Sequence, residues 1–192
     1  TASINWTKGP DKKVSEFKNK ELTVKIGENE QTLLGEFLSQ TTVDAFHISH
    51  KGKTIYTWHS DYCSSTTPHI IFSVSKSLTA LLIGCVIDEG LLSEETLVSQ
   101  IIPETKGSAF EDASVRNLLD MSVSSNFIED YEATSGIFLD YRQSTGWNPQ
   151  DIDDTSHLKS FLLSLKKNTH KHGEKFEYHS TNTDILGIII EK

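Results

Sequence analysis

The sequence is poor in cysteine, proline and methionine. Its 192 residues include two Cys, four Pro and one Met. The two cysteines, Cys63 and Cys85, are too few for a disulfide scaffold or a cysteine-rich metal domain, so we expect both to be reduced and structural. Hydrophobic residues make up 36% of the chain and charged residues 23%, which is typical of a globular protein and argues against disorder of the whole chain.

Positive charge and long apolar runs are also scarce. The chain has 18 Lys and Arg against 27 Asp and Glu, a formal net charge of −9. Nucleic acids and anionic membranes attract basic surfaces, so neither is an expected partner. The longest nearly apolar run, 78–87, falls far short of the roughly 20 residues that span a bilayer. The first residues do not read as a signal peptide, so the compartment stays open between cytoplasmic and periplasmic or secreted.

Hydrophobic periodicity predicts two strands followed mainly by helices. Residues 43–49 and 53–58 read as a hairpin whose turn contains Gly52, where a left-handed backbone is favourable. The predicted helix 75–89 ends at Gly90 and carries apolar residues on all of its faces. This pattern is typical of a central, buried helix. The other predicted features are helices from Ser114, from Thr155 or Ser156 and from about Ser180, a loop over 122–147 and a basic loop over 166–175.

This order of elements predicts an α+β fold with an unfinished sheet. A lone hairpin is only marginally stable, so it needs more strands. Residues 184–192 read as a core helix with no stop signal after it. We therefore expect the chain to be the front portion of a longer fold.

The first chemical signal is a Ser-x-x-Lys tetrad, Ser73 to Lys76, at the start of the apolar helix. Spacing of i and i+3 on a helix puts the ammonium beside the hydroxyl, which needs a nearby base or cation to act as a nucleophile. The N–H groups of a helix N-terminus can also stabilise an oxyanion. Similar tetrads at 15–18, 156–159 and 164–167 lack this context. The alternative reading is a helix cap with a solvated lysine.

The second signal is Tyr178, which lies just before the last predicted helix. A tyrosine near a lysine loses its proton more readily, because the cation favours the phenolate. Tyr178 could then take the proton of Ser73 and return it to a leaving group. The alternative is a core tyrosine followed by a helix cap at Ser180.

Three blocks, residues 69–92, 115–122 and 173–191, resemble the serine β-lactamase-like hydrolases, the group of class C β-lactamases, D-aminopeptidases and esterases. Within this group the chain is most similar to the 6-aminohexanoate-dimer hydrolase branch. The resemblance covers roughly residues 43–192. It is more specific than any one tetrad, because all three blocks occur in the expected order.

The resemblance implies an α/β sandwich, in which an antiparallel sheet is flanked by helices and an inserted subdomain is mostly helical. Residues 1–112 would form the N-terminal part of the α/β domain, with the hairpin 43–58 and the nucleophile helix 73–89. Residues 113–192 would form the helical subdomain that carries the tyrosine motif. The C-terminal strands of the sheet are missing from this chain.

The resemblance also implies the reaction, which is cleavage of a small amide or ester through an acyl-enzyme at Ser73. Lys76 would hold and tune the hydrogen-bond network between Ser73 and Tyr178. Tyr178 would act as general base and then as general acid, although Lys76 is the alternative base because coupled groups titrate as a unit. The N–H of Ser73 would supply half of the oxyanion hole, and water would release the acyl group. No cofactor is expected.

Two departures from the family pattern bear on activity. The class C pattern is Tyr-x-Asn, whereas this chain has Ser180 at the third position and Asn182 two residues later. The C-terminal strand that supplies the second oxyanion donor is absent, so we expect the chain alone to be inactive until a missing segment completes it. We assign substrate binding to four residues: Ser180, Asn182, Tyr131 and Trp147.

Other functions stay open. A ligand sensor that is not catalytic, or an acyltransferase on the same fold, is the alternative to a hydrolase. A zinc site at His170, His172 and His179 is disfavoured, because these residues lie in a polar, basic loop without a set of partner carboxylates. We expect a small-molecule amide or ester as the substrate, and a homodimer is one assembly to test.

Overall fold

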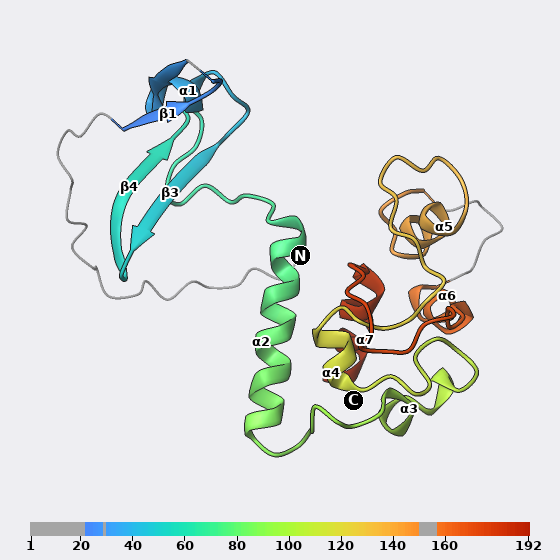
Figure 1. Cartoon of the computed structure of the whole chain (residues 1–192). Helices are drawn as coiled ribbons and strands as arrows, with labels where there is room; N and C mark the ends of the chain where they lie inside the picture. The colour runs from blue at the N-terminus through green and yellow to red at the C-terminus, as the bar shows by residue number, and fades with distance from the viewer. Residues whose placement is uncertain (1–21, 29, 150–156) are drawn as a thin grey trace. The chain divides into compact units, whose positions relative to one another are not determined.

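The computed structural model describes residues 22–28, 30–149 and 157–192. The chain divides into two compact units, Thr1–Ile70 and Ile71–Lys192 (Figure 1). Among the described residues, no helix has both the length and the apolar character that crossing a membrane requires. The division at residue 112 that the resemblance implies stays a prediction.

The first unit contains short antiparallel strands and one helix. Its described elements are β1 (Thr23–Lys25), β2 (Gln31–Leu33), α1 (Leu34–Ser39), β3 (Ala45–His50) and β4 (Lys53–His59). β1 pairs with β2, and β3 pairs with β4. The elements from β1 to α1 lie in a region where the sequence alone gives only weak signals.

The hairpin of β3 and β4 confirms the strands predicted at 43–58. Phe46 lies opposite Trp58 and Ile48 lies opposite Tyr56, which pairs large apolar side chains across the two strands. The turn needs two residues in the left-handed region, and φ is 48° at Lys51 and 73° at Gly52.

The Ser- and Thr-rich loop after β4 is held by Asp44. The Asp44 carboxylate accepts hydrogen bonds from the Tyr62 hydroxyl at 2.6 Å and from His69 Nε2. The other ring nitrogen of His69 donates to the carbonyl of Ile70 at 2.8 Å. The bonds from Tyr62 and His69 lower the pKa of Asp44, and the Asp44 carboxylate raises the pKa of His69. The loop end at residue 70 is thus tied to the start of β3.

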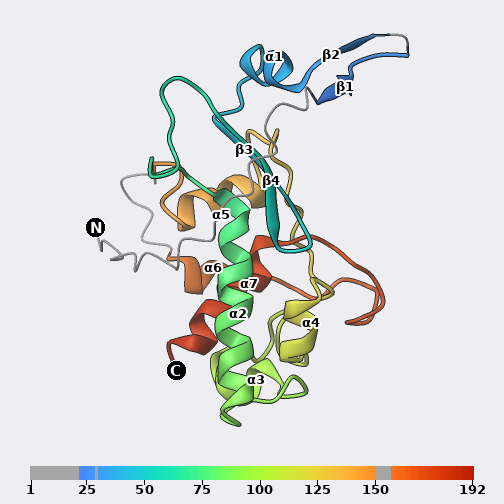
Figure 2. The ribbon, with the colours of Figure 1, turned by 90° about the vertical axis from the view of Figure 1, so that its left-hand side faces the viewer.

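The second unit is helical in its described part. It contains η1 (Phe72–Val74), α2 (Ser75–Asp88), α3 (Val98–Ile101), η2 (Pro103–Thr105), α4 (Val115–Leu119), α5 (Ile137–Ser144), α6 (Leu158–Ser164) and α7 (Ser180–Ile190). In Figure 1 α3–α7 lie on one side of α2, and in Figure 2, where α2 is in front, they lie behind it. α7 packs against both α2 and α4. Helices with two short antiparallel sheets confirm the α+β class.

The core of the second unit is built around Phe127, which is 1% exposed. Its ring packs edge-on against Tyr141, Phe161 and His179, with centroid distances of 5.2, 6.0 and 5.4 Å. These rings come from α5, α6 and the residue before α7, so one side chain joins three elements. Aromatic pairs in this geometry stabilise a core beyond their area burial.

The helix starts agree with the capping signals where they are described. Ser114 caps α4, and its side chain accepts the backbone N–H of Asn117, as predicted. α7 begins at Ser180, also as predicted. α6 begins at Leu158, whereas the predicted caps Thr155 and Ser156 lie outside the described residues.

The prediction of a loop throughout 122–147 is wrong, because α5 forms within it. Gly136 precedes this helix with φ of 81°. Phe138 and Tyr141 are three residues apart, so they share a face that packs on Phe127. Tertiary packing, rather than intrinsic propensity, explains a helix this short.

The prediction that α2 is buried on all sides is also wrong. α2, which is described throughout its length, buries only Ile83, whereas Leu78, Leu81 and Leu82 are 54%, 66% and 53% exposed. The reason is that α3–α7 cover one side of α2 and no described element of the second unit covers the other. Cys85 shares this exposure, and both cysteines are free.

Candidate active site

Ser73 and Lys76 are brought together at the start of α2. Lys76 Nζ donates a hydrogen bond of 2.8 Å to Ser73 Oγ. Ser73 lies in the short turn η1, which leads directly into α2, so the hydroxyl lies at the N-terminal end of a 14-residue helix. The helix dipole adds partial positive charge at this end. The arrangement can activate a serine oxygen toward an acyl carbon.

The backbone immediately before Ser73 is strained. Phe72 has φ of 40°, in the left-handed region that bulky side chains rarely adopt. The Ser75 hydroxyl donates to the carbonyl of Phe72, and the Phe72 ring lies 6.2 Å from the ring of Trp147. Strained residues of this kind cluster at functional sites, where neighbouring contacts hold them in place. Here the Ser75 hydrogen bond and the Trp147 contact hold the Phe72 backbone, and with it Ser73, in the turn.

The segment 166–177 leads to Tyr178 and fixes its position at this site. It is joined to residues 121–126 by backbone hydrogen bonds, from Asn126 N to the Lys166 carbonyl at 2.8 Å and from Glu177 N to the Met121 carbonyl at 2.8 Å. His172 adds a side-chain anchor, since its Nδ1 accepts the Ser124 N–H at 2.9 Å.

His172 therefore differs from the solvated loop residue that the sequence predicts. Because Nδ1 accepts a hydrogen bond, Nε2 carries the proton and donates to Asp112 at 3.0 Å. Burial lowers the pKa of His172, which favours this neutral form. Both ring nitrogens are occupied, so His172 has none left for a metal ion. No group of three or more potential metal ligands occurs among the described residues.

Tyr178 lies beside Lys76. Lys76 Nζ is 5.2 Å from the centroid of the Tyr178 ring, and the tyrosine is 39% exposed. The contact is a cation–π contact with the ring face, and it places the phenol next to the lysine that bonds Ser73. The three residues predicted to be catalytic thus meet around one ammonium group.

Glu129 is a site residue that sequence reasoning missed. Its carboxylate accepts the Ser180 N–H at 2.5 Å and the Ser180 hydroxyl at 2.8 Å, and it also accepts the hydroxyl of Tyr131. A carboxylate at the first N–H groups of α7 is favourable for the helix dipole. Partial shielding from water and the bond to Glu129 raise the pKa of Tyr131 to about 12. Glu129 thus ties two predicted substrate-binding residues together next to Tyr178.

The other two predicted substrate-binding residues lie apart from this cluster. Trp147 is 64% exposed and contacts Phe72, so it lies next to the turn that carries Ser73. Asn182 is fully buried in α7, where its amide donates to Met121 Sδ at 3.6 Å. The structure therefore does not bring Asn182 to the surface near Ser73.

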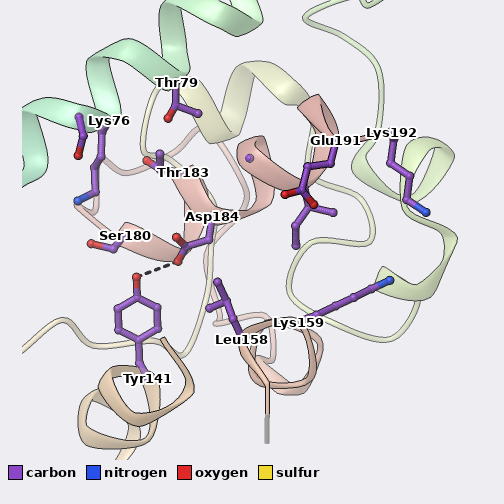
Figure 3. A pocket seen from close by; sticks show the side chains of 13 residues that line it. Lys76, Thr79, Tyr141, Leu158, Lys159, Ser180, Thr183, Asp184, Glu191 and Lys192 are labelled. Carbon is purple, nitrogen blue, oxygen red and sulfur yellow. Dashed lines mark hydrogen bonds between the residues drawn. The ribbon is translucent and has the colours of Figure 1, made fainter. Parts of the chain in front are cut away.

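A second residue without a sequence signal is Asp184, which lines a cavity of about 810 Å³ next to Lys76 (Figure 3). The Tyr141 hydroxyl donates a hydrogen bond of 2.8 Å to its carboxylate. Burial raises the pKa of Asp184 to about 6, against the opposing effects of the Tyr141 bond and the charge of Lys76. Burial also raises the pKa of Tyr141.

Known proteins resemble this chain in sequence and in fold. A family model described as Beta-lactamase matches residues 33–192. The chain belongs to the beta-lactamase family. A 6-aminohexanoate-dimer hydrolase from Paenarthrobacter ureafaciens is 31% identical over 159 residues, which are 83% of this chain and 40% of that protein.

A solved structure supports the fold. The structure described as "Putative 6-aminohexanoate-dimer hydrolase from Bacillus anthracis" superposes with a TM-score of 0.78 at 23% identity, over 92% of this chain and 47% of that one. The chain thus spans less than half the length of either protein. The family is that of the β-lactamase-like serine hydrolases, and its curated member named above is a hydrolase by name.

Proposed function

We propose that the protein is a serine hydrolase that cleaves an amide or ester bond through an acyl-enzyme at Ser73. The observation that carries the proposal is the 2.8 Å hydrogen bond from Lys76 to Ser73, with the Tyr178 ring 5.2 Å from the same ammonium group. The membership of the beta-lactamase family supports the same reaction class.

In the proposed reaction, Ser73 Oγ attacks the carbonyl carbon of the substrate. Its proton passes to the pair formed by Lys76 and Tyr178, with Tyr178 as the expected base, and a tetrahedral oxyanion forms. The Ser73 N–H, at the start of the helix, donates to this oxyanion. The pair then gives the proton to the departing amine or alcohol, and the bond to the carbonyl carbon breaks. Water attacks the acyl carbon and loses a proton to the same pair. The bond from that carbon to Ser73 Oγ then breaks, the pair returns the proton to Oγ, and the acid leaves.

We propose that the substrate is a small molecule bound between aromatic and polar side chains. Tyr131 and Trp147 are both exposed and lie beside Tyr178 and Phe72 respectively, and Ser180 adds a hydroxyl. The curated relative takes its name from a dimer of an amino acid, so we propose an amide bond ahead of an ester. Asn182 would need to move to reach a substrate.

We further propose that a C-terminal segment completes the protein. The exposed side of α2 carries Leu78, Leu81 and Leu82, a contiguous apolar surface of the kind that a sheet covers in a two-layer fold. The matched region covers 40% of the curated relative and 47% of the solved structure. Further strands would cover α2 and supply the second oxyanion donor, and without them the chain alone would be inactive. A homodimer is an alternative cover, which sedimentation equilibrium would detect.

An acylating or phosphonylating probe tests the proposal. A fluorophosphonate is added to the full-length protein and to the 192-residue chain, and the modified residue is located by mass spectrometry. We expect labelling at Ser73 in the full-length protein and weak labelling of the chain alone.

Ester and amide probes then separate the alternatives. An acyl group that leaves with water supports the hydrolase, a stable acyl-enzyme supports the sensor, and transfer to an added amine supports an acyltransferase. Absence of Ser73 labelling in the full-length protein would refute a serine nucleophile.

A further inference from the structure

The mechanism above leaves one mostly buried carboxylate unused. Asp184 lies on α7, one turn after Ser180, and its carboxylate faces the cavity that Lys76 and Tyr141 also line (Figure 3). The Tyr141 hydroxyl, from α5, makes a single hydrogen bond of 2.8 Å to it. A carboxylate in such a place needs an explanation, because burying a charge is costly.

The charges that shift the pKa of Asp184 come from two other elements. Lys76 from α2 attracts the carboxylate, whereas Glu129, from the loop before α5, repels it. Tyr141 from α5 is neutral at ordinary pH because burial raises its pKa. Lys159 from α6, and Glu191 and Lys192 after α7, line the same cavity. Among the positive charges that line it, Lys76 is the one whose charge lowers the pKa of Asp184.

The fold does not require this charge. An asparagine at 184 offers the same oxygen to the Tyr141 hydroxyl and has no ionised form to desolvate. Burial raises the pKa of Asp184 to about 6, so the ionised carboxylate weakens the folded state at neutral pH. A costly charge that lies beside a reactive lysine is typical of a functional site rather than of a packing device.

We propose that Asp184 is a positioning residue, whose partly buried carboxylate is the counter-charge that holds the Lys76 ammonium between Ser73 and Tyr178. The inference rests on the proposed function. It assigns to Asp184 no contact with the substrate. Its action is electrostatic, through Lys76, and it makes the proton relay depend on the ionisation of a group on α7.

A double-mutant cycle on stability tests the charge interaction without any activity. Asp184→Asn, Lys76→Met and the double variant are unfolded in urea at pH 7 and pH 4. At pH 7 we expect Asp184→Asn to raise the folding equilibrium constant about tenfold in the natural sequence. In the Lys76→Met background, where the Lys76 charge no longer offsets the carboxylate, the same change should raise this constant by a factor at least about three times larger. At pH 4, where the carboxylate is protonated in the folded state, the coupling should vanish.

Two results of the cycle would overturn the proposal. One is equal stabilisation, within twofold, by Asp184→Asn in both backgrounds at pH 7. The other is a loss of stability in Asp184→Asn at pH 7, because it would show that the charge serves the fold. Asp140→Asn, which removes an exposed carboxylate on α5, is the matched control and should show neither effect.

The rate of Ser73 labelling tests the role in the reaction. In the natural full-length protein, labelling should fall as Asp184 takes up a proton below about pH 6. Asp184→Asn should label about tenfold or more slowly at pH 7 and should not show this fall in rate below about pH 6, because it has no carboxyl to protonate there. Asp140→Asn should keep the natural rate and profile.

The two proposals fail in different ways. If the natural protein is not labelled at Ser73, the proposed hydrolase is refuted while the stability cycle still decides whether Asp184 and Lys76 interact. If the natural protein is labelled and Asp184→Asn keeps both its rate and its pH profile, the hydrolase stands and the positioning role of Asp184 is refuted.

Discussion

The helices α2 and α7 pack against each other, yet they are buried to very different extents. α7 buries Ile185, Leu186 and Ile189, together with three polar residues of its first turn. α2 is longer and equally apolar in composition, but it buries only Ile83 over its described length. The difference shows that apolar composition predicts a helix with an apolar surface, but does not predict which part of that surface is buried. That depends on the elements that fold around it.

Both helices carry a reactive group at their N-terminal end. Lys76 is in the first turn of α2, and Tyr178 lies two residues before the start of α7. α7 is anchored on the core, so it presents Tyr178 from a fixed position. The exposed apolar side of α2 is a surface that remains available for further strands. The following predictions test this division between an anchored and a partly covered helix.

The largest expected effect is on the nucleophile at the start of α2. Ser73→Ala should lower the rate of substrate turnover by the full-length protein about a thousandfold or more, because no other hydroxyl takes the place of Ser73 Oγ. The same change should alter the free energy of unfolding by less than about 0.5 kcal/mol, because Ser73 is exposed. Ser135→Ala, also exposed, is the control and should keep full turnover. Retained turnover in Ser73→Ala would remove Ser73 from the mechanism.

A smaller effect is expected at the start of α7. Tyr178→Phe should slow acylation about a hundredfold or more, which is the usual contribution of a general base. The ring remains, so its contact with Lys76 and the fold should survive. Single-turnover labelling measures the rate, and Tyr62→Phe removes a hydroxyl far along the chain as a control. A rate within threefold of the natural one would assign the base to Lys76 alone.

Paired leucine deletions compare the burial of the two helices directly. Leu186→Ala on α7, where the side chain is 2% exposed, should cost about 2–5 kcal/mol of unfolding free energy. Leu82→Ala on α2, where it is 53% exposed, should cost less than about 1 kcal/mol in the same 192-residue chain. Urea unfolding measures both. If further strands cover α2 in the full-length protein, the cost of Leu82→Ala should rise there.

The smallest effect concerns the pH dependence of the segment that leads to α7. Burial holds the pKa of His172 below its usual value of 6.5, so the unfolded chain binds more protons below about pH 6.5 and stability should fall as pH decreases. The loss should approach about 1 kcal/mol, the value of the Ser124 hydrogen bond that protonation breaks. His172→Asn keeps an acceptor without titrating and should remove this loss.

Asp184 contributes to the same titration with the opposite sign. Its raised pKa makes the folded chain bind more protons between about 3.8 and 6, so its contribution to stability falls as pH rises through that window. Comparing His172→Asn with Asp184→Asn from pH 5 to pH 7 separates the two. If the stability of neither variant changes with pH, both assignments are contradicted.

Sequence patterns predicted the local features well. The hairpin around Gly52, the start of α7 at Ser180 and the Ser114 cap all depend on residues close together in the chain. The helix α5 was missed because its reason to form is the packing of Phe138 and Tyr141 on Phe127, which is a long-range contact.

The candidate site divides in the same way. Ser73 and Lys76 are three residues apart on one helix start, so their contact follows from spacing. Glu129 and Asp184 are single carboxylates in ordinary polar surroundings, and nothing in the sequence marks them. Their contacts with Ser180 and Tyr141 span 51 and 43 residues, so only the folded chain reveals them.

The sequence by itself determined the elements that local chemistry controls, namely the hairpin, the apolar helices and the Ser-x-x-Lys tetrad, and it indicated the family. Only the tertiary structure decided which face of α2 is covered, which carboxylate lines the same cavity as Lys76 and how the segment before Tyr178 is anchored. The physical reason is the separation along the chain over which each interaction acts. Backbone preference and i to i+3 spacing act within a few residues, whereas burial and the electrostatics of a buried charge depend on every element that packs nearby.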